Sequence, residues 1–138
     1  QIVAMLRGFR SAAENLGLEI EDLLPVAGCD PGTVNASFPR LSSPPYATAL
    51  VAKTGTLTST DGGITVLAGF LNTVEGEVAF CVAAPRAAGR IRLARRTEES
   101  FVVNLLNRRG GAVPRQCGPP LATPSQNALI VTAEVALR

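Results

Sequence analysis

The sequence predicts an α+β fold in which an antiparallel sheet is flanked by helices. Apolar, strand-like segments follow one another at residues 48–58, 63–72 and 77–84, and the turn sequences STDGG and TVEG separate them. Connections this short join neighbouring strands in antiparallel order. Apolar residues at helical spacing precede and follow the strand segments. We therefore expect an antiparallel meander of these segments between two helices.

Residues 2–16 are predicted to form the first helix. Apolar residues recur there at helical spacing, polar residues lie between them, and Gly17 follows as a stop signal. The apolar set comprises Ile2, Met5, Leu6, Phe9, Ala13 and Leu16. This spacing places the set along one side of the helix, which is typical of an amphipathic helix.

A long connection follows at residues 19–47. Its prolines and glycines favour irregular structure over a helix or a strand. We expect Leu23, Leu24 and Val26 to anchor this loop to the core.

The strand segments carry apolar residues on both of their alternating faces, as in GITVLAGFL and EVAFCVAA. Apolar residues on both phases are expected where helices cover a sheet on at least one side. We predict that the helices at residues 2–16 and 98–109 pack on one face of the sheet.

The second helix is predicted at residues 98–109. Thr97 is a suitable cap residue, Glu98 and Glu99 fall in the first turn, and Gly110 follows the last turn. The apolar face of this helix comprises Phe101, Val102, Leu105 and Leu106. Residues 110–138 are predicted to be a loop-rich tail, in which NALIVTAEVAL is either a final strand or a short helix.

The composition is that of a globular protein, since 46% of the residues are hydrophobic and 17% are charged. The net charge of +2 is too small to favour nucleic acid or an anionic membrane surface as a partner. No apolar run reaches the roughly 20 residues of a membrane span. No signal peptide precedes the helical pattern after Gln1, so we expect residues 1–138 to be a single domain or the C-terminal fragment of a longer one.

The chain has 3 cysteines and no histidine, which restricts its chemistry. The absence of histidine excludes Ser-His-Asp, Cys-His and histidine general-base catalysis within this chain, and it disfavours zinc. Cys29, Cys81 and Cys117 allow at most one disulfide, and the apolar run EVAFCVAA predicts that Cys81 is a buried free thiol.

Lys53 is the single lysine among 13 basic residues, and it lies in the run LVAKTGTL of the first strand segment. Because side chains alternate along a strand, Lys53 and Gly55 share one face while Thr54 and Thr56 share the other. At an edge strand, the glycine lets a ligand approach closely, and the hydroxyl and ammonium groups can receive a carboxylate. The plainer interpretation is a surface lysine on a threonine-rich strand, and the triplet Lys-Thr-Gly alone does not decide between the two.

The segments LPVAGCDPGTV, ALVAKTGTL and LAGFLNTVEGEVAFCV occur in this order within residues 24–82. In order and spacing they resemble the D-alanyl-D-alanine carboxypeptidase/endopeptidase family of class C low-molecular-mass penicillin-binding proteins. The Lys-Thr-Gly triplet is one of three motifs of that superfamily, beside Ser-x-x-Lys and Ser-x-Asn. The resemblance implies that the chain is part of a β-lactamase/transpeptidase-like domain.

The resemblance also implies roles for the residues of the motif. Lys53 would be catalytic, since its charge would order the cleft and help proton transfer. Thr54, Gly55 and Thr56 would form the substrate-binding strand, with the two hydroxyls on the substrate's terminal carboxylate. The backbone N–H of Thr56 would be half of an oxyanion hole. Arginine is a poor substitute for Lys53, because a guanidinium is planar, bulky and effectively never neutral.

The chain departs from the family pattern in three places. Leu50 stands three residues before Lys53, so the nucleophilic Ser-x-x-Lys is missing and the chain alone is expected to be inactive. The SQN sequence at residues 125–127 has the letters of Ser-x-Asn but follows Lys-Thr-Gly instead of preceding it. Pro31 interrupts the usual Asp-Gly-Thr segment.

Two functions therefore fit the sequence, neither with a metal or another cofactor. The first is the C-terminal part of a serine-type D-alanyl-D-alanine carboxypeptidase or endopeptidase, whose nucleophile lies in a missing N-terminal part of the same protein. Its partners would be a peptidoglycan stem peptide or a β-lactam, and its place would be the periplasm or another extracytoplasmic part of the cell envelope. The second is a non-catalytic, degenerate relative that serves as a binding or assembly module.

Overall fold

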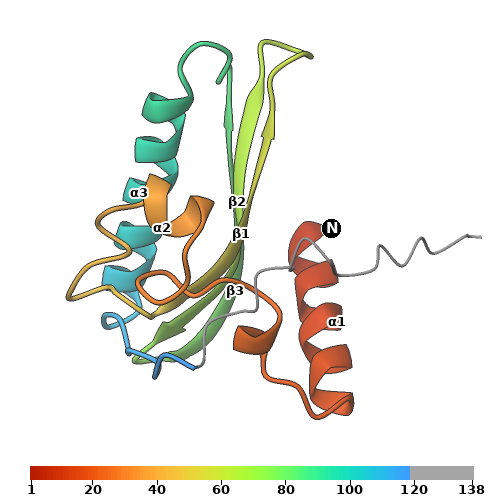
Figure 1. Ribbon diagram of the computed structural model, residues 1–138, viewed down its shortest axis with the longest axis vertical. Helices are drawn as coiled ribbons and strands as arrows, with labels where there is room; N and C mark the ends of the chain where they lie inside the picture. Colours follow the sequence, from red (N-terminus) through yellow and green to blue (C-terminus); the bar gives the residue numbers. More distant parts are fainter. Residues whose placement is uncertain (119–138) are drawn as a thin grey trace, which may run out of the picture.

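The computed structural model describes residues 1–118 and places helices on both faces of an antiparallel sheet (Figure 1). The elements in chain order are α1 (Ile2–Asn15), the 3₁₀ helix η1 (Ile20–Asp22), α2 (Thr33–Ser37), β1 (Leu50–Leu57), β2 (Ile64–Thr73), β3 (Gly76–Pro85) and α3 (Ile91–Arg108). The predicted element within NALIVTAEVAL and the SQN sequence lie outside the described residues.

The sheet is the predicted meander, with the strand order β1-β2-β3 and antiparallel pairing throughout. Lys53 pairs with Ala68 of β2, and Ala68 pairs with Cys81 of β3. The observed strand ends lie within two residues of the predicted ends. Apolar alternation and the turn sequences were therefore sufficient to predict the sheet, and the α+β fold class is confirmed.

The main core lies between the sheet and α3. It contains Phe38 and Leu41 of the long connection together with side chains of all three strands and of α3. The strand and helix residues of this core include Leu50, Ala52, Leu67, Leu71, Phe80, Val102, Val103 and Leu106. Gly69 lets β1 approach β2 closely, since a Cβ at this position would lie 2.6 Å from the Cα of Ala52.

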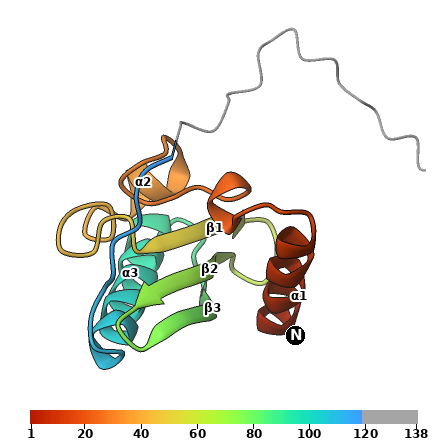
Figure 2. The same ribbon diagram turned by 90° about the horizontal axis from the view of Figure 1, so that it is seen from below.

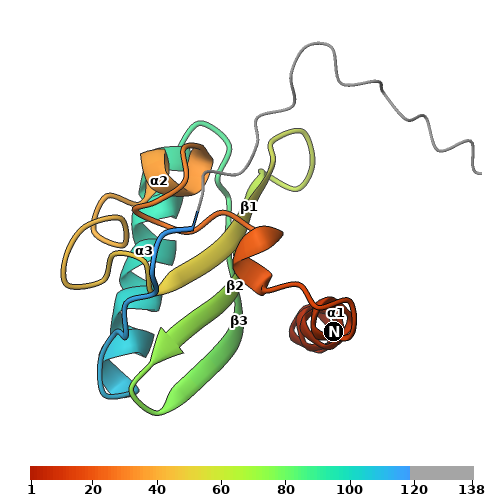
Figure 3. The same ribbon diagram turned by 60° about the horizontal axis from the view of Figure 1, so that its bottom comes forward.

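The two long helices lie on opposite faces of the sheet, so the prediction that they pack on one face is wrong (Figure 2). Figure 3 shows α1 on the second face of the sheet. There, Leu6 of α1 packs against a smaller core that contains Val51 and Phe70. The physical reason lies in β2, where Phe70 and Leu71 point to opposite faces and are both fully buried. Each face of the sheet is therefore packed against its own helix.

Helix α3 begins at Ile91, seven residues before its predicted start, and Arg90 is its N-cap in place of Thr97. Glu98 and Glu99 are consequently buried in the helix interior and not exposed in a first turn. Glu99 accepts hydrogen bonds from the backbone N–H groups of residues 40 and 41, at 2.7 and 3.3 Å. The carboxylate that suggested the first turn of a helix is thus bound by a distant loop from within α3.

Much of the predicted apolar side of α1 is open to solvent. Ala13 is its one buried residue among those described, whereas Met5 is 73% exposed and Leu16 is 76% exposed. The loop that follows is held mainly by Ile20, Phe38 and Leu41, which are fully buried. Of the predicted anchors, Val26 is buried, Leu24 is partly buried and Leu23 is exposed.

Residues 110–118 return along the sheet in irregular structure, and Cys117 forms a disulfide with Cys29. Arg115 binds Glu77 of β3 at 2.8 Å and Glu21 of η1, and it donates to the carbonyl oxygen of Ala49 at 3.0 Å. The tail is thereby tied to three parts of the fold. Within residues 1–118, no helix has the length and apolarity that crossing a membrane requires.

Candidate functional site

The Lys-Thr-Gly-Thr run lies on the outer edge of the described sheet, because β1 is an edge strand. The loop segment 25–27 bonds to Leu50 and Ala52 on that edge, with N···O distances of 2.9 and 3.1 Å. Beyond Ala52, no backbone bond forms on this edge within residues 1–118. Since outward-facing residues alternate along a strand, the N–H groups of Thr54 and Thr56 point to the open edge.

Lys53 is exposed, and its Nζ atom donates a hydrogen bond to the carbonyl oxygen of Thr54 at 2.8 Å. The ammonium group therefore lies at the same open edge as the backbone N–H groups. Gly55 is also exposed, and its nearest neighbour on that side is the Val66 side chain, 3.8 Å from where a Cβ would lie. A ligand thus meets no bulky side chain at Gly55.

The sheet face beside Lys53 carries small apolar side chains, and α1 does not cover this part of the face. Ala68 and Cys81 continue the row of Lys53 across the sheet, and Val66 and Ala83 form the next row. Cys81 is a free thiol, but it is partly exposed, so the prediction that it is buried is wrong. The reason is that α1 packs over Phe70 and Ala79, toward the other end of the strands.

The hydroxyl of Thr56 is bound from the opposite side of the sheet by Arg95 of α3. The Nη2 atom of Arg95 lies 2.7 Å from the Oγ1 atom of Thr56. Thr54 and Thr56 therefore share the face that α3 covers, and Lys53 lies on the other face, as strand alternation predicts.

Arg95 contacts the candidate site, and sequence reasoning missed it. It is only 6% exposed, its Nη1 atom lies 3.3 Å from Glu98 Oε2, and its guanidinium lies 5.5 Å from the ring centre of Phe38. The spacing of Arg95 and Glu98 in one helix does indicate an ion pair. Nothing in the sequence singles out this arginine among twelve, because its contact with Thr56 spans 39 residues.

The Glu98 carboxyl is fully buried, and this burial raises its pKa above the ordinary value of 4.5. The charge of Arg95, 3.3 Å away, acts in the opposite direction without cancelling the effect. The folded state therefore holds the Glu98 proton more tightly than the unfolded state does. The resulting contribution to stability is present below pH 4.5 and is lost as the pH rises through the higher folded-state pKa.

We expect the Glu98→Gln variant to gain stability relative to the wild type as the pH rises from about 4 to 7, because glutamine has no proton to lose. Melting temperatures across this range measure the difference. Glu75→Gln is the matched control for charge, since Glu75 is 54% exposed. A difference between Glu98→Gln and the wild type that does not change with pH would contradict the assignment.

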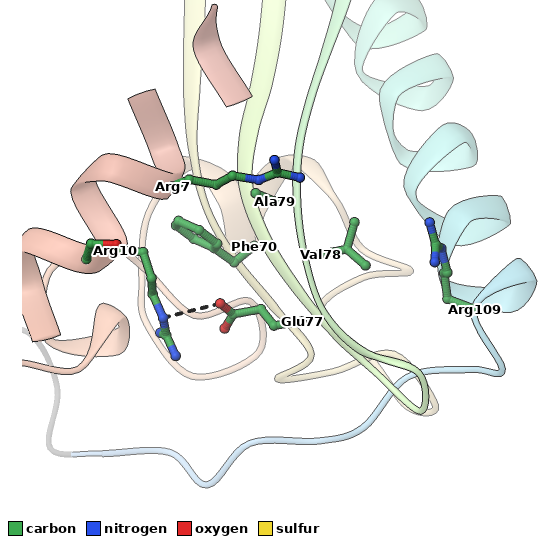
Figure 4. Close-up of a pocket in the computed structure, with 8 residues that line it drawn as sticks. Arg7, Arg10, Phe70, Glu77, Val78, Ala79 and Arg109 are labelled. Atoms are coloured by element: carbon green, nitrogen blue, oxygen red, sulfur yellow. Dashed lines mark ion pairs between the residues drawn. The ribbon is translucent and has the colours of Figure 1, made fainter. Parts of the chain in front are cut away.

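The largest of the main cavities does not contain the motif. It has a volume of about 370 Å³ and lies between α1 and β3, where Figure 4 shows Arg7 and Arg10 extending toward Glu77 and Ala79. Lys53 lines none of the five main cavities of the described residues. Volume alone would thus place the site elsewhere, but Arg10 is engaged in an ion pair with Glu77 at 3.3 Å. The open strand edge, by contrast, carries the Lys53 ammonium and, within residues 1–118, unpaired backbone N–H groups, which can bind a carboxylate.

The family model described as the D-Ala-D-Ala carboxypeptidase 3 (S13) family matches residues 3–105, which include α1, the whole sheet and most of α3. The chain belongs to this family. Peptidases of the S13 family are thus its relatives, and the motif strand lies within the matched region. A search of curated proteins finds no match for the chain.

Comparison with solved structures shows what share of a related protein's length this S13 chain covers. It is similar to the Bd0816 predatory endopeptidase from Bdellovibrio bacteriovorus in complex with immunity protein Bd3460, with a TM-score of 0.73 and 26% identity. That match covers 89% of this chain and 30% of the other. The penicillin G acylated Bd3459 endopeptidase of the same organism has the same fold, with a TM-score of 0.69, 22% identity, and coverage of 87% and 31%. The chain spans about 30% of the length of these relatives.

Proposed function

We propose that this S13 chain is the C-terminal part of a serine-type D-alanyl-D-alanine carboxypeptidase or endopeptidase of the class C penicillin-binding type, acting on peptidoglycan peptides. The observation that carries the proposal is a Lys-Thr-Gly-Thr run at an open strand edge, inside the region that the family model matches. An extended peptide can add to such an edge through its backbone, and side chains along the edge then select its end groups.

Each residue of the motif has a role in this proposal. Lys53 supplies the positive charge at the edge and assists proton transfer, while the hydroxyls of Thr54 and Thr56 bind the terminal carboxylate of the substrate. Gly55 lets the substrate backbone approach. The outward N–H of Thr56 donates to the attacked carbonyl oxygen as half of an oxyanion hole, in which fixed donors stabilise the developing negative charge.

The nucleophile in this proposal belongs to a part of the protein outside this chain. The only lysine of the chain has leucine three residues before it, so no Ser-x-x-Lys occurs. Exposed apolar surface marks an interaction site. The uncovered sheet face beside Lys53 and the exposed apolar residues of α1 therefore support a further segment that packs there. A helix that carries the serine would meet the ammonium group on this face.

The same proposal gives the partners and the location. The substrate is a peptidoglycan stem peptide, and a β-lactam would react at the same place, as penicillin G does with the Bd3459 endopeptidase. We place the protein in the periplasm or another extracytoplasmic part of the cell envelope. The Cys29–Cys117 disulfide supports this location, because disulfides persist in oxidising compartments.

A fluorescent penicillin tests the proposal. We expect the complete protein to carry a covalent label after denaturing electrophoresis, and we expect residues 1–138 alone to carry none, because acyl transfer needs an activated nucleophile. A labelled band for residues 1–138 alone would place the nucleophile in this chain and contradict the proposal. An unlabelled complete protein would favour the alternative, a non-catalytic relative that serves as a binding or assembly module.

A further inference from the structure

We infer that Arg95 is a positioning residue of the substrate site, which turns the hydroxyl of Thr56 into a dedicated hydrogen-bond donor for a carboxylate. This inference rests on the proposed function and extends it from the motif strand to α3. The observation behind it is the 2.7 Å contact between the Arg95 Nη2 atom and the Thr56 Oγ1 atom.

The direction of this hydrogen bond is fixed by chemistry. A guanidinium group has five N–H donors and no acceptor, so the Thr56 oxygen must accept. A threonine hydroxyl has one hydrogen to donate, and this hydrogen remains free for another partner. Within residues 1–118, the Thr56 hydroxyl makes no second hydrogen bond. Its hydrogen is therefore available to an acceptor that arrives from solvent, and a carboxylate accepts most strongly.

Arg95 is held in place for this task before any ligand binds. Its Nη1 atom contacts Glu98 Oε2 at 3.3 Å and the carbonyl oxygen of Val66 at 3.4 Å, and its guanidinium stacks on Phe38. With 6% of its surface exposed, the side chain has little freedom to leave. Donors that are fixed in advance do not have to reorganise when the anion arrives.

The arrangement also selects the chemical class of the ligand. A cationic group directly behind the hydroxyl polarises the O–H bond and attracts a negative charge, whereas a neutral ester or amide gains much less from it. Arg95 should therefore contribute to the preference for a free terminal carboxylate. It does so through Thr56, because the buried guanidinium is too enclosed to bind the ligand itself.

The test compares acylation of the complete protein by benzylpenicillin and by its methyl ester, which lacks the free carboxylate. The ratio of the two second-order rate constants measures the preference for the carboxylate. Arg95 and Glu98 are replaced together, as Arg95→Met with Glu98→Leu, because removing one partner would leave a buried charge unpaired. We expect the ratio to fall about tenfold, which is the scale of one hydrogen bond to a charged group.

Changes at Thr56 separate positioning from a merely structural role. Thr56→Val should lower the ratio to a similar extent, and Thr56→Ser should restore most of it. In the Thr56→Val background, the paired change at Arg95 and Glu98 should lower the ratio no further. Arg96→Met controls for the loss of an arginine from the same helix, since Arg96 is exposed; the paired change itself leaves the formal net charge unchanged.

Two results would overturn the inference. One is a ratio that stays at the wild-type value after the paired change, and the other is an equal fall of the ratio in the Thr56→Val background. If neither penicillin acylates the wild-type protein, the proposed function itself is wrong and the inference falls with it. Failure of the proposed function can be told apart from failure of the inference, because it is seen in the wild-type protein before any variant is made.

Discussion

Replacing Lys53 by arginine is expected to lower the rate of acylation by penicillin about 100-fold or more in the complete protein, the scale of a lost proton-transfer group. Charge is conserved in this change, but shape and acidity are not. The Lys53 ammonium is compact enough to lie 2.8 Å from the carbonyl oxygen of Thr54 at the strand edge. A planar guanidinium cannot occupy the same place, and it does not take part in proton relays near neutral pH.

Lys53→Ala should reduce acylation at least as strongly. Both variants should keep the melting temperature of the wild type, because Lys53 is exposed and belongs to none of the hydrophobic clusters. Arg108→Lys is the matched control, since it is a swap of the same two residue types at an exposed position of α3. An unchanged rate of acylation in Lys53→Arg, or a large fall of the melting temperature in both variants, would contradict this role and leave Lys53 as an ordinary surface lysine of the strand.

The sheet could be predicted because its signals are local. Alternation, β-branched residues and turn sequences are properties of neighbouring residues, and they located every strand to within two residues. The same alternation predicts which side chains of the motif share a face. Alternation does not predict that Lys53 lies on an edge strand, because this depends on which strands pair.

The rest of the fold depends on contacts between distant residues. The face that each helix covers depends on Phe70 and Leu71 together, and the Glu99 carboxylate in the middle of α3 is bound by a loop about 60 residues away in the sequence. Arg95 reaches Thr56 in the same way. Three cysteines allow three pairings, so the sequence could limit the chain to one disulfide but could not choose Cys29 and Cys117.

The Cys29–Cys117 disulfide should be the largest single contribution to the stability of the chain. It joins residues 88 positions apart, and closing a loop of this length is worth about 4 to 5 kcal/mol in the chain-entropy model. We expect Cys117→Ser to lower the free energy of unfolding by an amount that approaches this value. Denaturant unfolding of the oxidised protein, with the midpoint and slope fitted together, measures the change.

Two features of the structure make this expectation specific. Arg115 keeps its contacts with Glu21 and Glu77 when the disulfide is gone, so the folded tail is expected to stay near its place and the loss to arise mainly from the freer unfolded chain. Reducing the wild-type protein should therefore give the same midpoint as Cys117→Ser. Cys81→Ser is the matched control and should change stability little, since Cys81 is free and only partly buried. An oxidised wild-type protein with the midpoint of Cys117→Ser would show that the disulfide does not form or does not stabilise the fold.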